Sequence, residues 1–210
     1  MKVQFVCLAN SIKLNGRCVA GTVLLNNNPV LNFGNPTWVR PVSEMEHGEI
    51  STALVSQTKL LDILEIDLTK NVGNGFQSEN VLFDSTSLKK IGTLPYDHLT
   101  KFVTTSTDSK IFGNHGKSVH KDVINMIDYS LLMICLDEFS VKVIDSTKLR
   151  LLFTYNGFGY DLPITDPDFI RNYNSNNQIL EGKSEIFVTI SLAVEHNEWH
   201  SKLIAGIMYN

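Results

Sequence analysis

The sequence lacks the features of secreted, disulfide-bonded and membrane-spanning proteins. Its 210 residues include three cysteines, an odd number with no C-x-x-C pair, so a disulfide framework is not expected and a reducing compartment fits best. No apolar run approaches the roughly 18 residues that span a bilayer. The apolar N-terminal segment is interrupted by Gln4 and ends at Asn10, without the cleavage site of a signal peptide. We therefore predict a cytoplasmic protein with no membrane association.

Sequence patterns for metal, cofactor or catalytic chemistry are also missing. The six histidines form neither H-E-x-x-H nor a Cys/His zinc spacing. His196 and His200 are four residues apart, but their neighbours are typical of a short connection before a strand. The sequence predicts no metal site, no cofactor and no catalytic residue.

Acidic residues are absent from the first 43 positions, although the whole chain has a formal net charge of -4. The same stretch carries four basic residues, Lys2, Lys13, Arg17 and Arg40. A locally positive segment in an acidic chain favours docking of an anion such as phosphate, because neighbouring charges do not cancel its field. The alternative is a mostly buried pair of strands whose few charges are solvated.

Strand patterns dominate the rest of the sequence. Runs of Val, Ile, Leu and Phe are separated by turns rich in Gly, Asn and Pro, which is typical of β-structure. Strands are predicted at 2–9, 17–25, 37–41, 59–68, 80–83, 88–92, 130–144, 149–155, from 160 onward, 185–194 and 202–209. Helical turns are expected at 97–103. A helix start is expected at Asp166-Pro167-Asp168, because Asp can cap a helix and Pro is tolerated at its first position.

A composition shift near the middle divides the chain. Residues 104–122 are rich in Thr, Ser, Asp, Asn, Gly and His, which is typical of a linker or an exposed crossing loop. About five strands on each side fit two small barrels or one large sandwich. The lengths and the scarcity of helix favour two OB-like β-barrels in a mainly β chain with few short helices. The predicted parts are an N-terminal barrel (1–104), a connecting segment (105–128) and a C-terminal barrel (129–210).

The first candidate binding cluster lies at the tip of a predicted N-terminal β-hairpin, whose turn spans residues 10–16 and is followed by Arg17. Lys13 and Arg17 can present charged donors to one or two phosphates, while Asn10, Ser11 and the turn amides add neutral contacts. The alternative interpretation is a solvated turn without a ligand.

A second cluster combines an aromatic and a basic residue. Trp38 and Arg40 are two residues apart, so on a strand they share one face, and Ser43 follows as a neutral donor. Such a pair can stack a base and hold its phosphate, as single-strand binders do. The alternative is a Trp packed in a barrel with the Arg stacked over it.

A third cluster lies near the predicted helix start. Asp161 and Asp166 could form a metal or acid–base pair, with Thr165 beside them. Asp166 has a structural explanation as a helix cap, and Arg150 could pair with Asp161. The sequence leaves this choice open.

Several short motifs in order along the chain resemble the prokaryotic dual OB-containing domain family. They are Leu8-Ala9-Asn10-Ser11-x-Lys13, Gly16-Arg17-Cys18-Val19-Ala20-Gly21, Trp38-Val39-Arg40-Pro41-Val42-Ser43, Glu79-Asn80-Val81-Leu82, Tyr160-Asp161-Leu162-x-Ile164-Thr165-Asp166-Pro167, Ser191-Leu192 and Lys202-Leu203-Ile204-Ala205. The resemblance spans almost the whole chain. It implies two OB-type barrels and a role related to nucleic acids, in bacterial defence settings.

Three functions follow as hypotheses. The leading one is a non-catalytic module that binds single-stranded nucleic acid or a nucleotide. Its predicted contact residues are Ser11, Lys13, Arg17, Trp38, Arg40 and Ser43, with Asn10, Asn80, Asp161, Thr165 and Asp166 as weaker candidates. The second is a protein-interaction subunit that uses the same residues as internal struts. The third is a nucleotide hydrolase, which the missing metal-ligand spacing disfavours. The acidity of the chain argues against a general nucleic-acid binder, which draws on many phosphate contacts.

Overall fold

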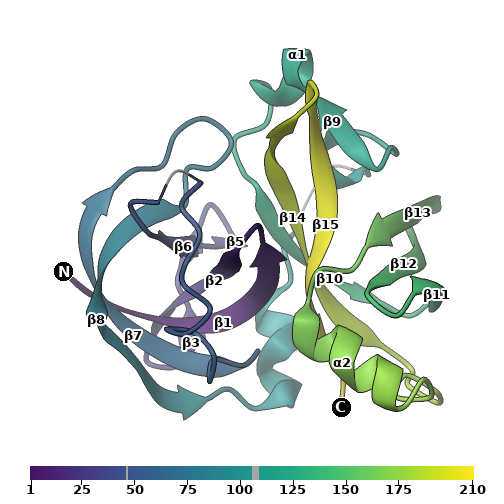
Figure 1. The fold of residues 1–210 in the computed structure, drawn as a ribbon, viewed down its shortest axis with the longest axis horizontal. Helices are drawn as coiled ribbons and strands as arrows, with labels where there is room; N and C mark the ends of the chain where they lie inside the picture. The colour runs from purple at the N-terminus through teal and green to yellow at the C-terminus, as the bar shows by residue number, and fades with distance from the viewer. Residues whose placement is uncertain (46, 106–108) are drawn as a thin grey trace.

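The computed structural model describes residues 1–45, 47–105 and 109–210. The protein consists of two curled β-structures that lie side by side, with short helices at their edges (Figure 1). Residues 2–93 supply the strands of the first, and most strands of the second lie between residues 131 and 208. Within the described ranges, no helix is long and apolar enough to cross a membrane.

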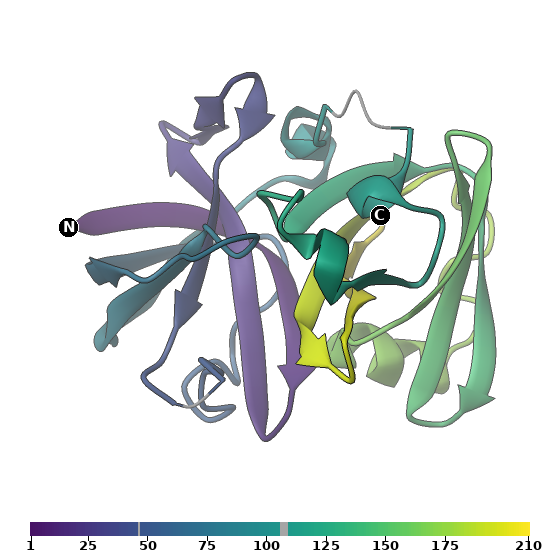
Figure 2. The ribbon, with the colours of Figure 1, turned by 90° about the horizontal axis from the view of Figure 1, so that it is seen from above.

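The first β-structure is a closed five-stranded barrel (Figure 2). Its strands are β1 (Lys2–Lys13), β2 (Gly16–Leu25), β6 (Trp38–Val42), β7 (Asp62–Asn71) and β8 (Asn80–Thr93). The order around the barrel is β1-β7-β8-β6-β2, and the β1–β2 pairing closes it. All pairs are antiparallel except β6 with β8. This is the closed Greek-key arrangement expected of an OB-type barrel.

The second β-structure repeats this strand order but closes less completely. Its strands are β10 (Leu131–Leu136), β11 (Phe139–Asp145), β12 (Lys148–Tyr155), β13 (Phe158–Pro163), β14 (Ile186–His196) and β15 (Trp199–Met208). β10 and β11 act as one bent strand, since β10 pairs with β14 and β11 pairs with β12. Between β13 and β15 the structure has a single parallel bridge, Ile164 to Ile204. The result is a curled half-barrel.

The remaining elements are short. Three two-residue strands, β3 (Asn28–Pro29), β4 (Leu31–Asn32) and β5 (Asn35–Pro36), decorate the connection from β2 to β6. Two 3-10 helices, η1 (Tyr96–Phe102) and η2 (Ile111–Gly113), strand β9 (Ser118–His120) and helix α1 (Lys121–Ile124) precede β10. Helix α2 (Pro167–Ser175) begins directly after the predicted cap Asp166. The prediction of a mainly β chain with two OB-like barrels and few short helices is thereby confirmed.

Two local expectations differ from the structure. The turn predicted at residues 10–16 is much shorter, because β1 runs to Lys13 and β2 starts at Gly16. The segment predicted as a connection, 105–128, contains β9, which pairs with β15 as an edge strand of the second sheet. Residues 106–108 of that segment lie outside the described part of the chain.

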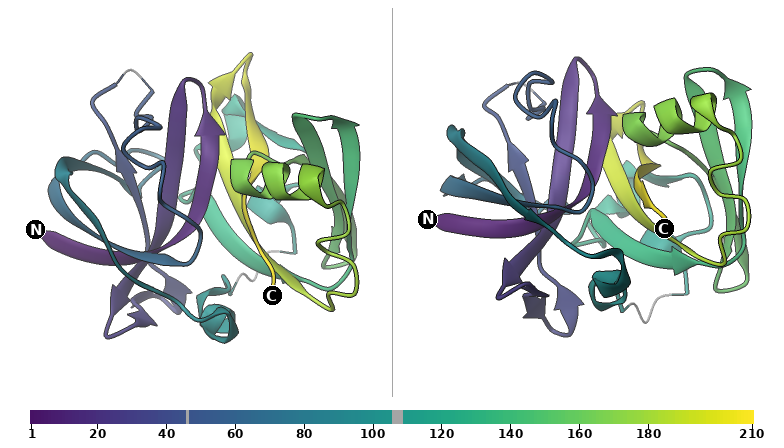
Figure 3. Two further views of the ribbon diagram at one scale, coloured as in Figure 1. Left: turned by 60° about the horizontal axis from the view of Figure 1, so that its bottom comes forward. Right: turned by 90° about the horizontal axis from the view of Figure 1, so that it is seen from below.

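The two barrels meet through β1 and β15, which lie side by side (Figure 3). Small residues allow this approach, because a Cβ on Gly206 would come within 2.4 Å of the carbonyl oxygen of Leu8. Ala9, Ala20 and Ala205 pack together at the same junction. The Ile12 amide also donates to the Thr165 carbonyl at 2.8 Å, which links the N-terminal hairpin to the second barrel. The junction therefore holds the hairpin beside β14 and β15.

Candidate binding sites between the barrels

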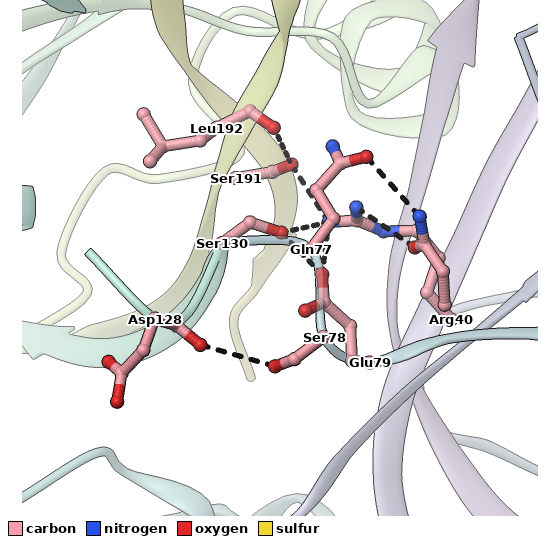
Figure 4. Close-up of polar contacts among 9 residues, drawn as sticks. Arg40, Gln77, Ser78, Glu79, Asp128, Ser130, Ser191 and Leu192 are labelled. Atoms are coloured by element: carbon pink, nitrogen blue, oxygen red, sulfur yellow. Dashed lines mark hydrogen bonds and ion pairs between the residues drawn. The ribbon is translucent and has the colours of Figure 1, made fainter. Parts of the chain in front are cut away.

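A buried polar network lies at the centre of the junction (Figure 4). Arg40 is only 2% exposed, and its guanidinium pairs with Glu79 at 3.0 Å. It also donates to the hydroxyl of Ser130 at 2.9 Å, and Ser130 in turn donates to Glu79. Weaker contacts reach Ser191 at 3.5 Å and Asn80 at 3.4 Å. Because Ser130 and Ser191 belong to the second barrel, Arg40 ties the two barrels together rather than facing solvent.

A cleft of about 550 Å³, which we call the inter-barrel cleft, opens at one end of this network. Its volume is in the range of small-molecule sites, roughly 300–1,000 Å³. Trp38, half-buried on β6, lines it together with Phe33, which is 99% exposed on the turn between β4 and β5. The other lining residues are polar or small: Asn32, Asn35, Pro36, Thr37, Ser78, Glu79, Thr104, Thr105, Asp128, Tyr129, Ser130 and Leu131. None of these described residues is basic, and two are acidic, Asp128 and the Arg40-paired Glu79, so the cleft offers aromatic surface together with neutral and acidic hydrogen-bonding groups.

A smaller cavity of about 70 Å³, which we call the notch, opens at the other end of the network. Lys13 and Ser11 on β1, Arg40 on β6 and Ser191 on β14 line it. Gln77, from the loop between β7 and β8, completes its polar wall. Burial lowers the pKa of Lys13, and the nearby charge of Arg40 lowers it further. The notch is therefore a small, partly desolvated and positively charged space.

The structure separates the two basic residues of the predicted hairpin cluster. Lys13 pairs with Gly16, and Arg17 pairs with Ile12, one residue away on β1. Neighbouring side chains on a strand point to opposite faces, so Arg17 and Lys13 face different sides of the hairpin. Arg17 instead exchanges two main-chain hydrogen bonds with Ile50. Of the hairpin residues, the notch thus brings Ser11 and Lys13 together with Arg40, and leaves Arg17 out.

The second predicted cluster is divided as well. Trp38 lines the cleft, whereas Arg40 lines the notch. Ser43 lies at neither site: its hydroxyl donates to the Glu49 carbonyl and accepts from the Met45 amide at 3.2 Å. The side chain of Ser43 thus organises the loop after β6.

The weaker candidates have structural partners. Asn10 is buried and donates to the Thr58 carbonyl at 2.8 Å, and Asn80 lies between Arg40 and Gln77. Thr165 donates to the Ile204 carbonyl at 3.1 Å across the incomplete side of the second barrel.

The two acidic candidates are engaged in the same way. Asp161 pairs with Arg150, which also donates to the Asp161 carbonyl at 2.7 Å. Asp166 caps α2, accepting from the amides of Asp168 and Phe169 at 3.0 Å each, and its second oxygen accepts from Ile207 at 3.2 Å. Asp161 and Asp166, the two acids on which the hydrolase hypothesis depended, therefore both have structural partners. No metal-binding group of His, Cys, Asp and Glu occurs among residues 1–45, 47–105 and 109–210.

Sequence reasoning missed three residues of these sites. Phe33 lies in the predicted loop 26–36, between Asn32 and Gly34, and an aromatic residue in such a loop is a signal that could have been used. Gln77 and Ser191 carry no such signal, because they are far from Lys13 in sequence and only the barrel junction brings them together.

Two tandem OB-type barrels, with polar cavities at their junction, define this protein as a dual OB protein. The chain belongs to the dual OB-containing domain family, whose model matches residues 3–207. The resemblance found in the sequence motifs is thereby confirmed.

None of the curated proteins compared with the chain is detectably similar to it. Among solved structures, similarity extends to the p204 HINb domain, with 9% identity over 99% of this chain and 95% of that one and a TM-score of 0.39. The chain is also similar to a murine DNA-binding protein bound to double-stranded DNA, with 6% identity, 100% and 97% coverage and a TM-score of 0.37. The Ifi202 HINa domain in complex with double-stranded DNA gives 8% identity, 100% and 95% coverage and the same TM-score of 0.37.

Proposed function

We propose that this protein is a binding module for single-stranded nucleic acid or a nucleotide, and that the inter-barrel cleft receives a base. The observation that carries the proposal is the pairing of a fully exposed Phe33 with the half-buried Trp38 along one polar cleft. An aromatic side chain left in water at a turn contributes nothing to the core, whereas it offers a stacking surface to every base.

The position of the cleft within the first barrel also supports the proposal. OB-folds commonly bind oligonucleotides on the face of their second and third strands, and Trp38 lies on β6, the third strand of this barrel. Asn32, Asn35 and Thr105 add amide and hydroxyl groups that can contact base edges.

The charge of the cleft selects among nucleic-acid ligands. Its described lining has no Lys or Arg, Arg40 behind it is paired with Glu79, and Lys110 lies in an adjoining hollow that shares Thr104 and Tyr129 with the cleft. Double-stranded binders that follow the phosphate backbone need many such contacts. One or two unpaired bases, or a nucleotide, therefore suit the cleft better than a long duplex.

The test is binding of a fluorescently labelled short thymidine strand and of free nucleotides to the whole chain, measured by anisotropy. Phe33→Ala should weaken binding about tenfold, because stacking on one aromatic side chain contributes about 1–3 kcal/mol per base. The matched control is Leu31→Ala, an exposed apolar residue of the same small hairpin that does not line the cleft. Neither change should alter the melting temperature, since both side chains are exposed.

Two results would refute this proposal. One is the absence of binding to any single strand or nucleotide, and the other is an equal effect of the Phe33 and Leu31 changes. The cytoplasmic location and the bacterial defence setting stay predictions, the former from the sequence and the latter from the family resemblance.

The burial of Arg40 favours one element of the second hypothesis, a protein-interaction subunit with internal struts. In that case Arg40 and Trp38 changes lower the melting temperature, and a partner protein rather than an oligonucleotide binds the surface. Size-exclusion chromatography of the chain with single strands, and then with proteins encoded beside it, separates the two functions.

A further inference from the structure

Hydrogen-bond donors without acceptors surround the notch. The ammonium group of Lys13 makes no ion pair or hydrogen bond within the described part of the chain, and the Ser11 hydroxyl likewise has no partner there. Gln77 accepts from Asn80 through its oxygen, which leaves its amide nitrogen to donate elsewhere. Among the described residues, the Ser191 hydroxyl has two hydrogen-bond partners, Arg40 and the Leu192 carbonyl, both at the long distance of 3.5 Å.

Arg40 adds a buried donor to the same space. Its two terminal nitrogens are engaged in the polar network, but its Nε is buried and has no hydrogen-bond partner among the described residues. A buried donor without an acceptor costs about 1–3 kcal/mol, so its persistence indicates a missing acceptor.

The notch also carries an excess of positive charge, so its charge and its hydrogen-bond donors favour the same kind of occupant, an anion. None of the described lining residues is acidic. Glu79 balances Arg40, which leaves the charge of Lys13 in excess at the cavity. Glu49 attracts Lys13 from beyond the lining without forming an ion pair with it.

The volume of the notch limits the occupant. About 70 Å³ corresponds to roughly two water molecules at about 30 Å³ each, which is the size class of a tetrahedral oxyanion and too small for a nucleoside. We propose that the notch binds a single phosphate group between the two barrels, held by Lys13, Ser11 and Gln77 on one side and Ser191 on the other. This site is separate from the cleft and does not depend on the proposed function.

Such an occupant would also fix the barrels relative to each other. Lys13 and Ser11 belong to β1 of the first barrel, and Ser191 belongs to β14 of the second. A phosphate that accepts from both sides stabilises only the docked arrangement, so phosphate should raise the melting temperature of the whole chain.

The experiment is calorimetric titration of the whole chain with inorganic phosphate at constant ionic strength, with chloride as the exchanged ion. Saturable binding is expected, and Lys13→Met should weaken it about tenfold, because one charge-assisted hydrogen bond is lost while the aliphatic stem stays. Ser191→Ala should weaken it by a smaller factor, about threefold. Lys70→Met, on the exposed end of β7, is the matched control and should leave phosphate affinity unchanged.

The proposal would be overturned by the absence of saturable phosphate binding, or by equal phosphate affinity in the wild type and the Lys13→Met variant. Loss of phosphate binding in Lys70→Met as well would also overturn it, because the effect would then be general screening. Melting temperatures of all variants without phosphate show that each is folded.

The source of the phosphate group is resolved by competition. If a 5′-phosphorylated strand displaces inorganic phosphate and the 5′-hydroxyl strand does not, the site is supported as one for strand ends. If neither strand displaces it, the site is supported as one for the free ion. Phe33→Ala should leave phosphate titration unchanged, so failure of the cleft and failure of the notch are distinguishable.

Discussion

The two barrels bury charged side chains in different ways. In the first barrel, three of the four buried acids among the described residues have a basic partner: Glu79 pairs with Arg40, Asp62 with Lys90, and Glu65 with Lys2 and Lys89, whereas Glu49 forms no ion pair. Hydrogen bonding to Lys89 and then to Gln4 lowers the pKa of Glu65 to about 2. The partners of Asp62 and Glu65 lie on neighbouring strands, where cross-strand pairs of opposite charge stabilise a sheet, and Glu79 directly precedes β8, the neighbour of β6.

In the second barrel, two buried charges have main-chain partners instead. Lys202 is fully buried on β15 and donates to the carbonyls of Ile111 and Asn114, at 2.6 and 2.8 Å, and to the Asn114 side chain. Asp166 accepts from three amides. Burial lowers the pKa of Lys202 to about 7 and raises the pKa of Asp166 to about 6.

The difference follows from how each barrel closes. A closed ladder satisfies its own amides and carbonyls, so side chains are free to pair with one another. The gap between β13 and β15 has one bridge, and the segment before β9 crosses the sheet without a ladder, so main-chain groups there need side-chain partners. In the second barrel, buried charged side chains thus form hydrogen bonds with main-chain groups that strand pairing leaves without partners.

The largest expected effect is on the ion pair at the junction. Arg40→Ala leaves Glu79 buried without its partner, and we expect the free energy of unfolding to fall by about 3–5 kcal/mol. Urea denaturation measures this. The double change Arg40→Met with Glu79→Leu should recover most of the loss, because no uncompensated charge remains. An Arg40→Ala variant as stable as the wild type would show that the pair is not buried in solution.

A smaller effect is expected at the cap of α2. Asp166→Ala removes the acceptor of three amides and should lower the free energy of unfolding by about 1–2 kcal/mol. Asp166→Asn should cost less, because an amide oxygen still accepts. The matched control is Asp122→Ala at α1, where the acid is exposed.

Asp166 also has a distinct pH dependence. Its pKa is raised in the folded state from 3.8 to about 6, so its contribution to stability is present below pH 3.8 and is lost as the pH rises through about 6. In Asp166→Asn this dependence should disappear. If the variant keeps the full wild-type profile between these pH values, the carboxyl is not buried as described.

The contribution of Lys202 should appear as a pH dependence of the free energy of unfolding rather than as a large loss of stability at one pH. Its pKa is lowered in the folded state from 10.5 to about 7, so its contribution to stability is present above pH 10.5 and is lost as the pH falls through about 7. Denaturation of the wild type and of Lys202→Met at several values across this range measures the difference. An increase of this stability difference with pH supports the lowered pKa of Lys202, and parallel pH profiles of the two proteins contradict it.

The smallest effect is expected at the half-exposed pairs of the first barrel. Lys89→Met should lower the free energy of unfolding only slightly, and high salt should reduce this difference. Because the pKa of Glu65 is lowered from 4.5 to about 2, its contribution is present above pH 4.5 and is lost as the pH falls through about 2. Lys70→Met provides the control. If Lys89→Met lowered the free energy of unfolding as much as Arg40→Ala does, the expected difference between exposed and buried ion pairs would be contradicted.

Much of the fold could be predicted from the sequence, because its signals are local. Val- and Ile-rich runs marked most strands, and Asp166 followed by Pro167 marked the start of α2. The single strand β8 was predicted as two, because Asp84, Ser85 and Thr86 interrupt its apolar pattern; its pairing with β7 shifts register between Asp84 and Lys89 and continues on both sides of the shift.

The candidate site was less predictable, because exposure is a property of the assembled barrels. Arg40 looked like a ligand contact in a basic segment, yet its partner Glu79 is distant in sequence and Ser130 more so. Lys13 and Ser11 were found by their local spacing. Gln77 joins them only because the loop before β8 reaches the notch.

The sequence by itself determined that this chain is mainly β, belongs to the dual OB-containing domain family and has an acid-free N-terminal segment with four basic residues. Only the tertiary structure decided which of those charges are free. Arg40 became a buried strut, because pairing of β6 with β8 places Glu79 beside it and docking of β1 against β15 adds Ser130 and Ser191. Lys13 was left unpaired, because no acid is among the described residues that line the notch. Charge can be read from a sequence, but its neutralisation depends on contacts between residues far apart in the chain.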